Sequence, residues 1–104
     1  MSKFYNILGS GSVDHELVAP DAENNIKSIS IANVHSSNDA NFSLFIQDDP
    51  ISGSTSTYNI IHKIAIPPLT TLFLDDPSMF LFGEEFGLYV NVGSGDTIDV
   101  IVNQ

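Results

Sequence analysis

The sequence predicts an all-β domain, an antiparallel β-sandwich or jelly roll of about seven or eight strands. Apolar side chains recur at every second position in several short runs, and turn-forming residues separate these runs. No segment shows the 3.6-residue period of an amphipathic helix over a helix-length window. Because every second side chain of a strand lies on the same face, each run can line one side of a core.

The first strand is expected within residues 1–12, where a short apolar patch precedes the sequence Gly9-Ser10-Gly11-Ser12. Glycine and serine are typical of flexible connections. The sequence therefore predicts an N-terminal strand or arm over 1–12, joined to a sandwich over 13–104 within a single domain. Pairing of the strand in the same sheet is favoured over docking of an arm on a neighbouring subunit.

The next strands surround two polar segments, residues 35–41 and 47–57. Ile29 and Ile31 share one parity, and the parity slips between Ile31 and Val34, which indicates a β-bulge or the end of the strand. After the first polar segment, alternating apolar residues predict a strand over 42–46.

Four further strands follow, with turn residues between them. Pro67-Pro68 is expected to end one strand, because proline cannot donate to a β-ladder. Asp75-Asp76-Pro77 ends the next, and residues 93–96 predict a tight hairpin between the last two strands. The apolar positions that define these strands by parity are Tyr58, Ile60, Ile64 and Ile66, then Leu72 and Leu74, then Leu88, Val90 and Val92, and finally Ile98, Val100 and Val102.

Composition excludes several classes of protein. The 104 residues include 3 Lys+Arg and 13 Asp+Glu, for a formal net charge of −10, and Arg is absent. Binding to nucleic acid or to an anionic membrane needs a basic surface, so neither partner is expected. The chain has no Cys, which excludes a disulfide scaffold, a Cys-based zinc site and a thiol nucleophile. No apolar run is long enough for a signal peptide or a membrane span.

Candidate chemical groups are few. His15, His35 and His62 lie far apart in sequence, and none has a second ligand at the spacing of a metal site. His62 has the inward parity of its strand, and His35 is expected to be exposed. No nucleophile elbow or phosphate-binding loop is present. The sequence therefore predicts a protein that is not an enzyme and that needs no cofactor.

Three acidic pairs, Asp48-Asp49, Asp75-Asp76 and Glu84-Glu85, raise the question of a calcium site, because calcium takes oxygen ligands from loops. None matches an EF-hand loop, and neighbouring residues of a strand point to opposite faces. No metal site is therefore predicted, and Asp turn residues at strand ends explain the pairs. The residues that a calcium site would use are Asp48, Asp49, Asp75 and Asp76. A glycosidase carboxylate pair is less favoured still.

The segment over residues 77–86 is unusually apolar for one element, and it is compatible with either one helical turn or a short strand. Strand alternation buries only half of such residues unless both faces are covered. The segment therefore either crosses between the sheets or contacts another subunit. The candidate interface residues are Met79, Phe80, Phe82 and Phe86.

The order of segments resembles small virion structural proteins of tailed bacteriophages, notably marine ones. The resemblance covers about residues 26–102. It rests on a strand ending in Ala32-Asn33, a polar turn, a strand ending in Ile66-Pro67, and Leu72-Phe-Leu-Asp75. It implies a head decoration or cement protein, or a neck, tail or fibre component, and such proteins are often trimeric. The longer connection over 77–87 and the absence of Arg depart from the pattern and leave the partner surface open.

The expected function is that of a capsid decoration or cement protein, made in the host cytoplasm and located on the virion. Its expected partners are copies of itself, with a trimer favoured, and the major capsid protein or other virion proteins. A tail component is the first alternative. The second is a carbohydrate- or calcium-dependent binding module that uses the loop aspartates. Acidity of this size suits a saline setting, where screening weakens repulsion between subunits.

Overall fold

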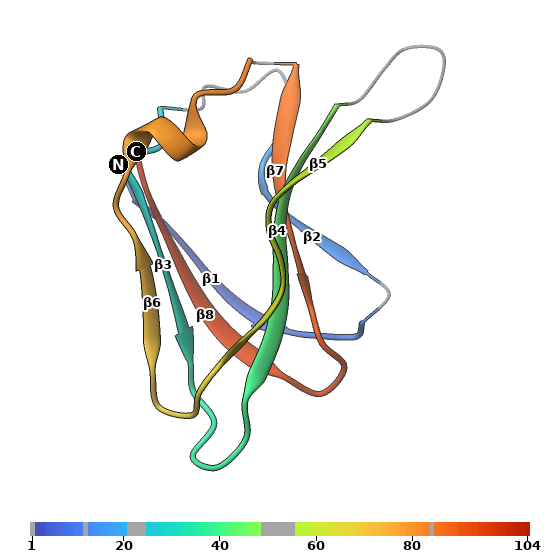
Figure 1. The fold of residues 1–104 in the computed structure, drawn as a ribbon, viewed down its shortest axis with the longest axis vertical. Coiled ribbons are helices and arrows are strands. Elements are labelled where there is room, and N and C mark those ends of the chain that lie inside the picture. The colour runs from blue at the N-terminus through green and yellow to red at the C-terminus, as the bar shows by residue number, and fades with distance from the viewer. Residues whose placement is uncertain (1, 12, 21–24, 49–55, 84) are drawn as a thin grey trace.

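The computed structural model of the chain describes residues 2–11, 13–20, 25–48, 56–83 and 85–104 (Figure 1). Eight strands and one short 3₁₀ helix make up the described chain. Their bounds are β1 Ser2–Leu8, β2 Asp14–Val18, β3 Ser28–Asn33, β4 Ala40–Asp48, β5 Thr57–Ile66, β6 Thr71–Leu74, η1 Pro77–Phe80, β7 Phe86–Val92 and β8 Thr97–Asn103.

The strands form two antiparallel sheets of four that pack as a sandwich (Figure 1). Sheet A has the order β1-β8-β3-β6, and sheet B has the order β2-β7-β4-β5. Each sheet pairs a strand from the start of the chain with one from its end, β1 with β8 and β2 with β7. Two strands from the middle of the chain complete each sheet, β3 and β6 in sheet A and β4 and β5 in sheet B. This is the arrangement of a jelly roll built from two Greek keys. The predicted fold class is confirmed.

The core lies between the sheets and uses the parity that the sequence shows. Sheet A contributes Ile29, Ile31 and alternate residues of β8, all fully buried. Opposite them, Phe42, Leu44 and alternate residues of β7 face inward from sheet B. Val34 lies one residue beyond the end of β3 and is exposed, so the parity slip there marks the end of a strand.

Strand β5 differs from the prediction. His62 is exposed, not inward-facing, because the pairing of β4 with β5 shifts on both sides of Leu44. Lys63 has a φ of 51°, the left-handed region that β-bulges use. Because of these two shifts, alternate side chains of β5 do not all face the same side of the sheet. The neighbours Ile60 and Ile61 therefore both pack against the core.

The turn after β7 is present as predicted, but it does not make a hairpin. The amide of Asp96 donates to the carbonyl of Gly93 at 3.0 Å, and Gly95 has a φ of +82°. Strand β7 belongs to sheet B and β8 to sheet A, so the turn carries the chain from one sheet to the other. The two strands that it joins are therefore not paired with each other.

Residues 2–8 form an edge strand of sheet A, paired along their whole length with β8. The glycines that follow are held by hydrogen bonds to the turn after β7, not free. Gly9 donates to the carbonyl of Asp96 at 2.8 Å and accepts from Gly95 at 3.1 Å, and Gly11 donates to Val92 at 3.1 Å. A Cβ atom at Gly9 would lie 2.2 Å from the carbonyl oxygen of Gly93, so glycine is required for this close approach.

The buried polar side chain of Asn33 connects the two sheets. Asn33, at the end of β3, is 3% exposed. Its side-chain nitrogen Nδ2 donates to the carbonyl oxygens of Asn38 at 2.8 Å and Ile66 at 3.0 Å, and its side-chain oxygen accepts from the backbone amide of His35 at 3.0 Å. The side chain therefore ties the end of β3 in sheet A to the end of β5 in sheet B.

Candidate functional site

Of the four aspartates considered for calcium, the three that the structure describes lie at two separate strand ends. Asp48 closes β4 in sheet B, where its carboxylate accepts from the amide of Ser56 at 2.7 Å. Asp75 and Asp76 follow β6 of sheet A and are exposed. Asp49 and Glu84 lie outside the described residues. Among the residues that the structure describes, no group of three or more His, Asp or Glu side chains is arranged to hold a metal ion.

Asp76 has a structural task in this arrangement. Its carboxylate accepts from the hydroxyl of Ser78 at 2.7 Å and from the amide of Ser78 at 3.0 Å, which caps η1. Hydrogen bonds favour the ionised form of a carboxyl group. The side-chain bond first, and then the backbone bond, lower the pKa of Asp76 below its ordinary value.

The three histidines lie on different elements and do not converge. His15 is on β2, opposite Val90, and its Nε2 atom is buried without a hydrogen-bond partner. The Nε2 atom of His35 accepts from the amide of Thr97 at 3.3 Å, so His35 is half-buried instead of exposed. His62 lies on the edge strand β5.

The predicted interface residues divide between the core and the surface. Phe80 is 3% exposed and belongs to the hydrophobic core, so its side chain is not available to a partner. Phe82 is partly buried against the same core. Phe86 packs edge-on against Tyr58, with 5.8 Å between ring centroids, and Met79 remains exposed. The segment was expected to form either a helical turn or a short strand, and residues 77–80 form the helical turn, at one end of the sandwich (Figure 1).

A hollow of about 400 Å³ opens beside this segment. Its walls come from the segment itself and from residues that precede β3, namely Asn25, Ile26, Lys27, Pro77, Phe80, Leu81 and Phe82. Leu81, at 83% exposure, is the most exposed large apolar side chain of the described surface.

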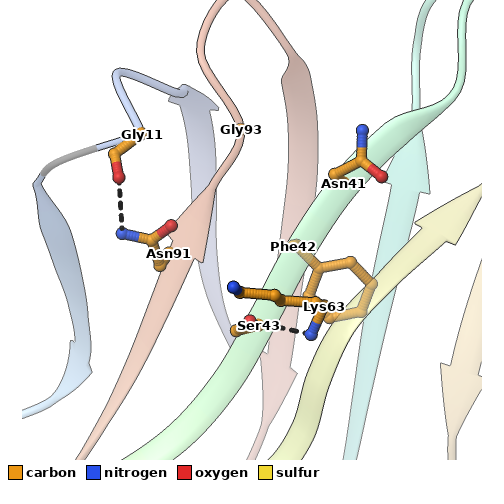
Figure 2. Close-up of a pocket in the computed structure, with 7 residues that line it drawn as sticks. All are labelled: Gly11, Asn41, Phe42, Ser43, Lys63, Asn91 and Gly93. Atoms are coloured by element: carbon orange, nitrogen blue, oxygen red, sulfur yellow. Dashed lines mark hydrogen bonds between the residues drawn. The ribbon is translucent and has the colours of Figure 1, made fainter.

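A second hollow, of about 320 Å³, lies on the outer face of sheet B (Figure 2). Figure 2 shows the side chain of Lys63 extending across β4 in the direction of Asn91. The amide of Lys63 donates to the hydroxyl of Ser43 at 2.9 Å, and the side-chain nitrogen of Asn91 donates to the carboxylate of Asp14 at 3.0 Å. The polar groups around this hollow are thus largely engaged with their own neighbours.

The outer face of sheet A is the surface that sequence analysis did not identify. Strand register places Phe4, Ile101, Ser30 and Phe73 in one row across all four strands. Phe4 is 73% exposed and Phe73 is 55% exposed, and they occupy the two edge strands of the sheet. A hollow of about 340 Å³ lies beside Phe4, between β1 and β8. Exposed aromatic side chains in this arrangement are typical of a contact surface.

Polar side chains on the same face bond to one another. The hydroxyl of Ser2 donates to the side-chain oxygen of Asn103 at 2.6 Å, and the side-chain nitrogen of Asn103 donates to the hydroxyl of Ser28 at 2.8 Å. The side-chain nitrogen of Asn6 donates to the carboxylate of Asp99. Asp99 is the only ionisable residue at an outward position of the four strands. We call this surface, from β1 across to β6, the sheet A face.

Comparisons of the chain with protein-family models, with curated proteins and with solved structures find no match. Within the described residues, no helix has the length and apolar character needed to span a membrane.

Proposed function

We propose that this protein is a structural, non-enzymatic subunit of a bacteriophage virion, a decoration or cement protein on the capsid. The observation that carries the proposal is the sheet A face, where Phe4 and Phe73 are exposed on a surface that holds one carboxylate. Solvent-exposed aromatic side chains are favoured when a partner covers them. A subunit that stabilises a particle needs such a surface.

The jelly-roll topology is compatible with this role, since the fold recurs in viral capsid proteins. The same fold also occurs in lectins and cupins, so the topology alone does not distinguish these functions. The resemblance of residues 26–102 to small phage structural proteins favours the virion over the other two. A neck, tail or fibre position is the alternative within the same class.

The distribution of chemical groups favours a structural role over catalysis. Asp48 lies at an end of sheet B, whereas Asp75 and Asp76 follow a strand of sheet A, and Asp76 is engaged in capping η1. Catalysis by paired carboxylates requires two such groups beside one substrate position. Asp48 is instead the last residue of β4, and Asp75 and Asp76 directly follow β6.

Charge supports an assembly subunit in a second way. A net charge of −10 keeps free subunits apart in solution. Salt screens this repulsion, with a Debye length of about 10 Å at 0.1 M and about 3 Å at 1 M ionic strength. Apolar contact surfaces then bring subunits and particle together at high salt, which matches a saline setting.

The proposal is tested on particles purified by density gradient from a culture that expresses the gene. Peptides of this chain should be detected by mass spectrometry in the particle band, in an amount comparable with the structural proteins. A host protein of matched abundance in the lysate serves as the control for carry-over. Detection of the chain only in the soluble fraction would contradict a virion role.

A further inference from the structure

We propose that the sheet A face packs against the same face of a second copy of this chain, so that two subunits form a two-fold symmetric dimer. The inference rests on the proposed function, because it names the partner of the surface that the proposed function uses. Charge, hydrogen bonding and the order of side chains across the face all favour a second copy as the occupant.

Charge is the first argument. The chain carries 13 acidic residues, yet only Asp99 lies at an outward position of the four strands of sheet A. A strongly basic or acidic partner would find almost no ionic counterpart on this face. A second copy brings the same four strands, with one carboxylate at an outward position. Like charges on opposed surfaces cost binding energy, so the depletion of acids favours self-association at this face.

Hydrogen bonding is the second argument. Covering a polar group without a partner is costly, and this cost limits which polar faces can be buried. On the sheet A face, Ser2, Asn103 and Ser28 form a chain of hydrogen bonds across β1, β8 and β3. Asp99 accepts from Asn6 in the next row. These groups keep their bonds when the face is covered, which reduces the desolvation cost of the contact.

The order of side chains is the third argument. Across the sheet the row reads Phe4, Ile101, Ser30 and Phe73. A two-fold axis parallel to the strands reverses this order in the opposing copy. Each Phe4 then faces the partner subunit's Phe73, and each Ile101 faces the partner's Ser30.

The reversed row is complementary to the original in size. Large Ile101 meets small Ser30 at the centre, and aromatic rings meet at both edges. The hollow of about 340 Å³ beside Phe4 gives the opposing phenyl ring room to enter. A contact in which each residue meets the partner of the other is what an isologous interface requires. Sheets packed face to face in this way lie about 10 Å apart, as in the core of a sandwich.

The extent of the face sets the expected strength. The four strands hold 7, 7, 6 and 4 residues, which at about 3.3 Å rise and about 4.8 Å spacing span roughly 380 Å² in projection. A standard interface buries about 800 Å² of accessible surface per partner. The contact is therefore at the small end of stable interfaces, and the dimer should dissociate on dilution.

The test is sedimentation velocity of the full chain at concentrations from about 5 μM to about 500 μM, in about 0.05 M and about 0.5 M sodium chloride. Three proteins are compared: the wild type, the double variant Phe4→Thr with Phe73→Thr, and Leu81→Thr. Threonine keeps a high β-propensity at the two strand positions. Leu81 is exposed and apolar but lies outside the sheet A face, so its variant is the matched control. Thermal unfolding confirms that each variant is folded.

The expected result is a species of twice the subunit mass of 11.3 kDa, which grows with concentration and with salt. The double variant should remain monomeric at the highest concentration, and Leu81→Thr should behave as the wild type. If the double variant does not fold, Ser30→Asp, which puts like charges at the centre of the contact, takes its place. A monomer under all conditions, a trimer, or a dimer lost in Leu81→Thr alone would overturn the inference. A monomeric chain still found in purified particles would overturn the dimer and leave the proposed function standing.

Discussion

The phenolic hydroxyl of Tyr5 donates a 2.5 Å hydrogen bond to the backbone carbonyl of Leu17, and this bond joins the two sheets at their edges. Tyr5 lies on β1, the edge strand of sheet A, and Leu17 lies on β2, the edge strand of sheet B. The chain passes from sheet A to sheet B between β1 and β2, so the bond links the two strands on either side of this crossing. Burial, and to a lesser extent the negative charge of Glu16, raise the pKa of Tyr5 above 10.0.

Removing this bond should reduce the free energy of unfolding. The Tyr5→Phe variant loses the donor and leaves the Leu17 carbonyl with one partner fewer, at an expected cost of about 1 kcal/mol. A loss of this size lowers the melting temperature of a domain of this length by about 4–8 °C. Urea unfolding followed by circular dichroism measures the difference. A variant as stable as the wild type would show that the bond does not hold the sheets together.

The raised pKa of Tyr5 adds a pH dependence. The folded state favours the neutral phenol, so its contribution is complete below the unfolded pKa of about 10 and is lost as pH rises through the higher folded pKa. Between about pH 8 and about pH 10.5, the wild type should therefore lose more stability than Tyr5→Phe. Tyr58 and Tyr89 are present in both proteins and cancel in the comparison. Equal losses in the two proteins would contradict the assignment.

Asn33 should be among the least replaceable polar residues. Its side chain is 3% exposed, and it satisfies backbone groups of β5 and of the segment after β3. Asn33→Ala removes the side-chain donor to the carbonyls of Ile66, where the bond is buried, and of Asn38, at an expected cost of about 2–3 kcal/mol. Asn33→Asp should cost more, because a carboxylate faces the Asn38 and Ile66 carbonyl oxygens and cannot donate to them.

The control for this prediction is Asn41→Asp, since Asn41 is an exposed strand residue of the same type. Chemical denaturation of the four proteins gives the comparison. A stability of Asn33→Asp equal to or above that of Asn33→Ala would contradict the donor role of the Asn33 amide.

Phe80 and Leu81 are neighbours with opposite roles, and their alanine variants should separate the core from the surface. Phe80→Ala removes a core ring and should cost about 3–5 kcal/mol. Leu81→Ala changes an exposed side chain and should lie within about 0.5 kcal/mol of the wild type. Differential scanning calorimetry distinguishes the two. A stable Phe80→Ala protein would return Phe80 to the candidate interface residues.

Asp76 should contribute to stability only while it is ionised. Hydrogen bonds from Ser78 lower its pKa, so its contribution is present above the unfolded value of about 3.8 and is lost as pH falls through the lower folded value. Asp76→Asn still accepts hydrogen bonds but does not titrate. Below about pH 4, the wild type should lose stability more steeply than Asp76→Asn. Parallel acid-unfolding curves would contradict the cap.

Calcium should not stabilise the protein specifically. A loop site with a Kd of about 10⁻⁴ M would add about 2.7 kcal/mol at 10 mM calcium. The described aspartates form no such cluster, so the melting temperature in calcium should match that in magnesium at equal ionic strength. A calcium-specific rise of several degrees, lost in Asp48→Asn or Asp75→Asn, would favour the binding-module alternative.

Much of the fold could be predicted from parity and turn chemistry. Alternating residues such as Ile29, Ile31 and Val100 are fully buried, and β5 ends at Ile66, directly before Pro67-Pro68. The prediction that His62 faces inward was wrong, because Lys63 forms a bulge there in a left-handed conformation. No glycine in the sequence indicates this bulge. The turn over residues 93–96 was recognisable, but its sequence does not tell whether the two strands share a sheet.

The sheet A face could not be predicted from the sequence, because it depends on which strands share a sheet and in which register they pair. Parity places Phe73 opposite to Leu72 and Leu74, which identifies it as outward-facing once β6 is known. Nothing in the sequence says that Phe73 and Phe4, 69 positions apart by their numbers, fall in one row. That alignment depends on the register of three strand pairs. The apolar segment over 77–86 is recognisable from its composition, and Phe80, Phe82 and Phe86 pack against other residues of the same chain.

Immunoelectron microscopy of intact particles tests the central claim most directly. An antibody against the recombinant chain is applied to particles released from a culture that expresses the gene, with pre-immune serum as the control. We expect label distributed over the surface of the capsid. Label confined to the tail would move the protein to the alternative position on the virion, and no label above the control would contradict the account of this protein as an exposed virion subunit.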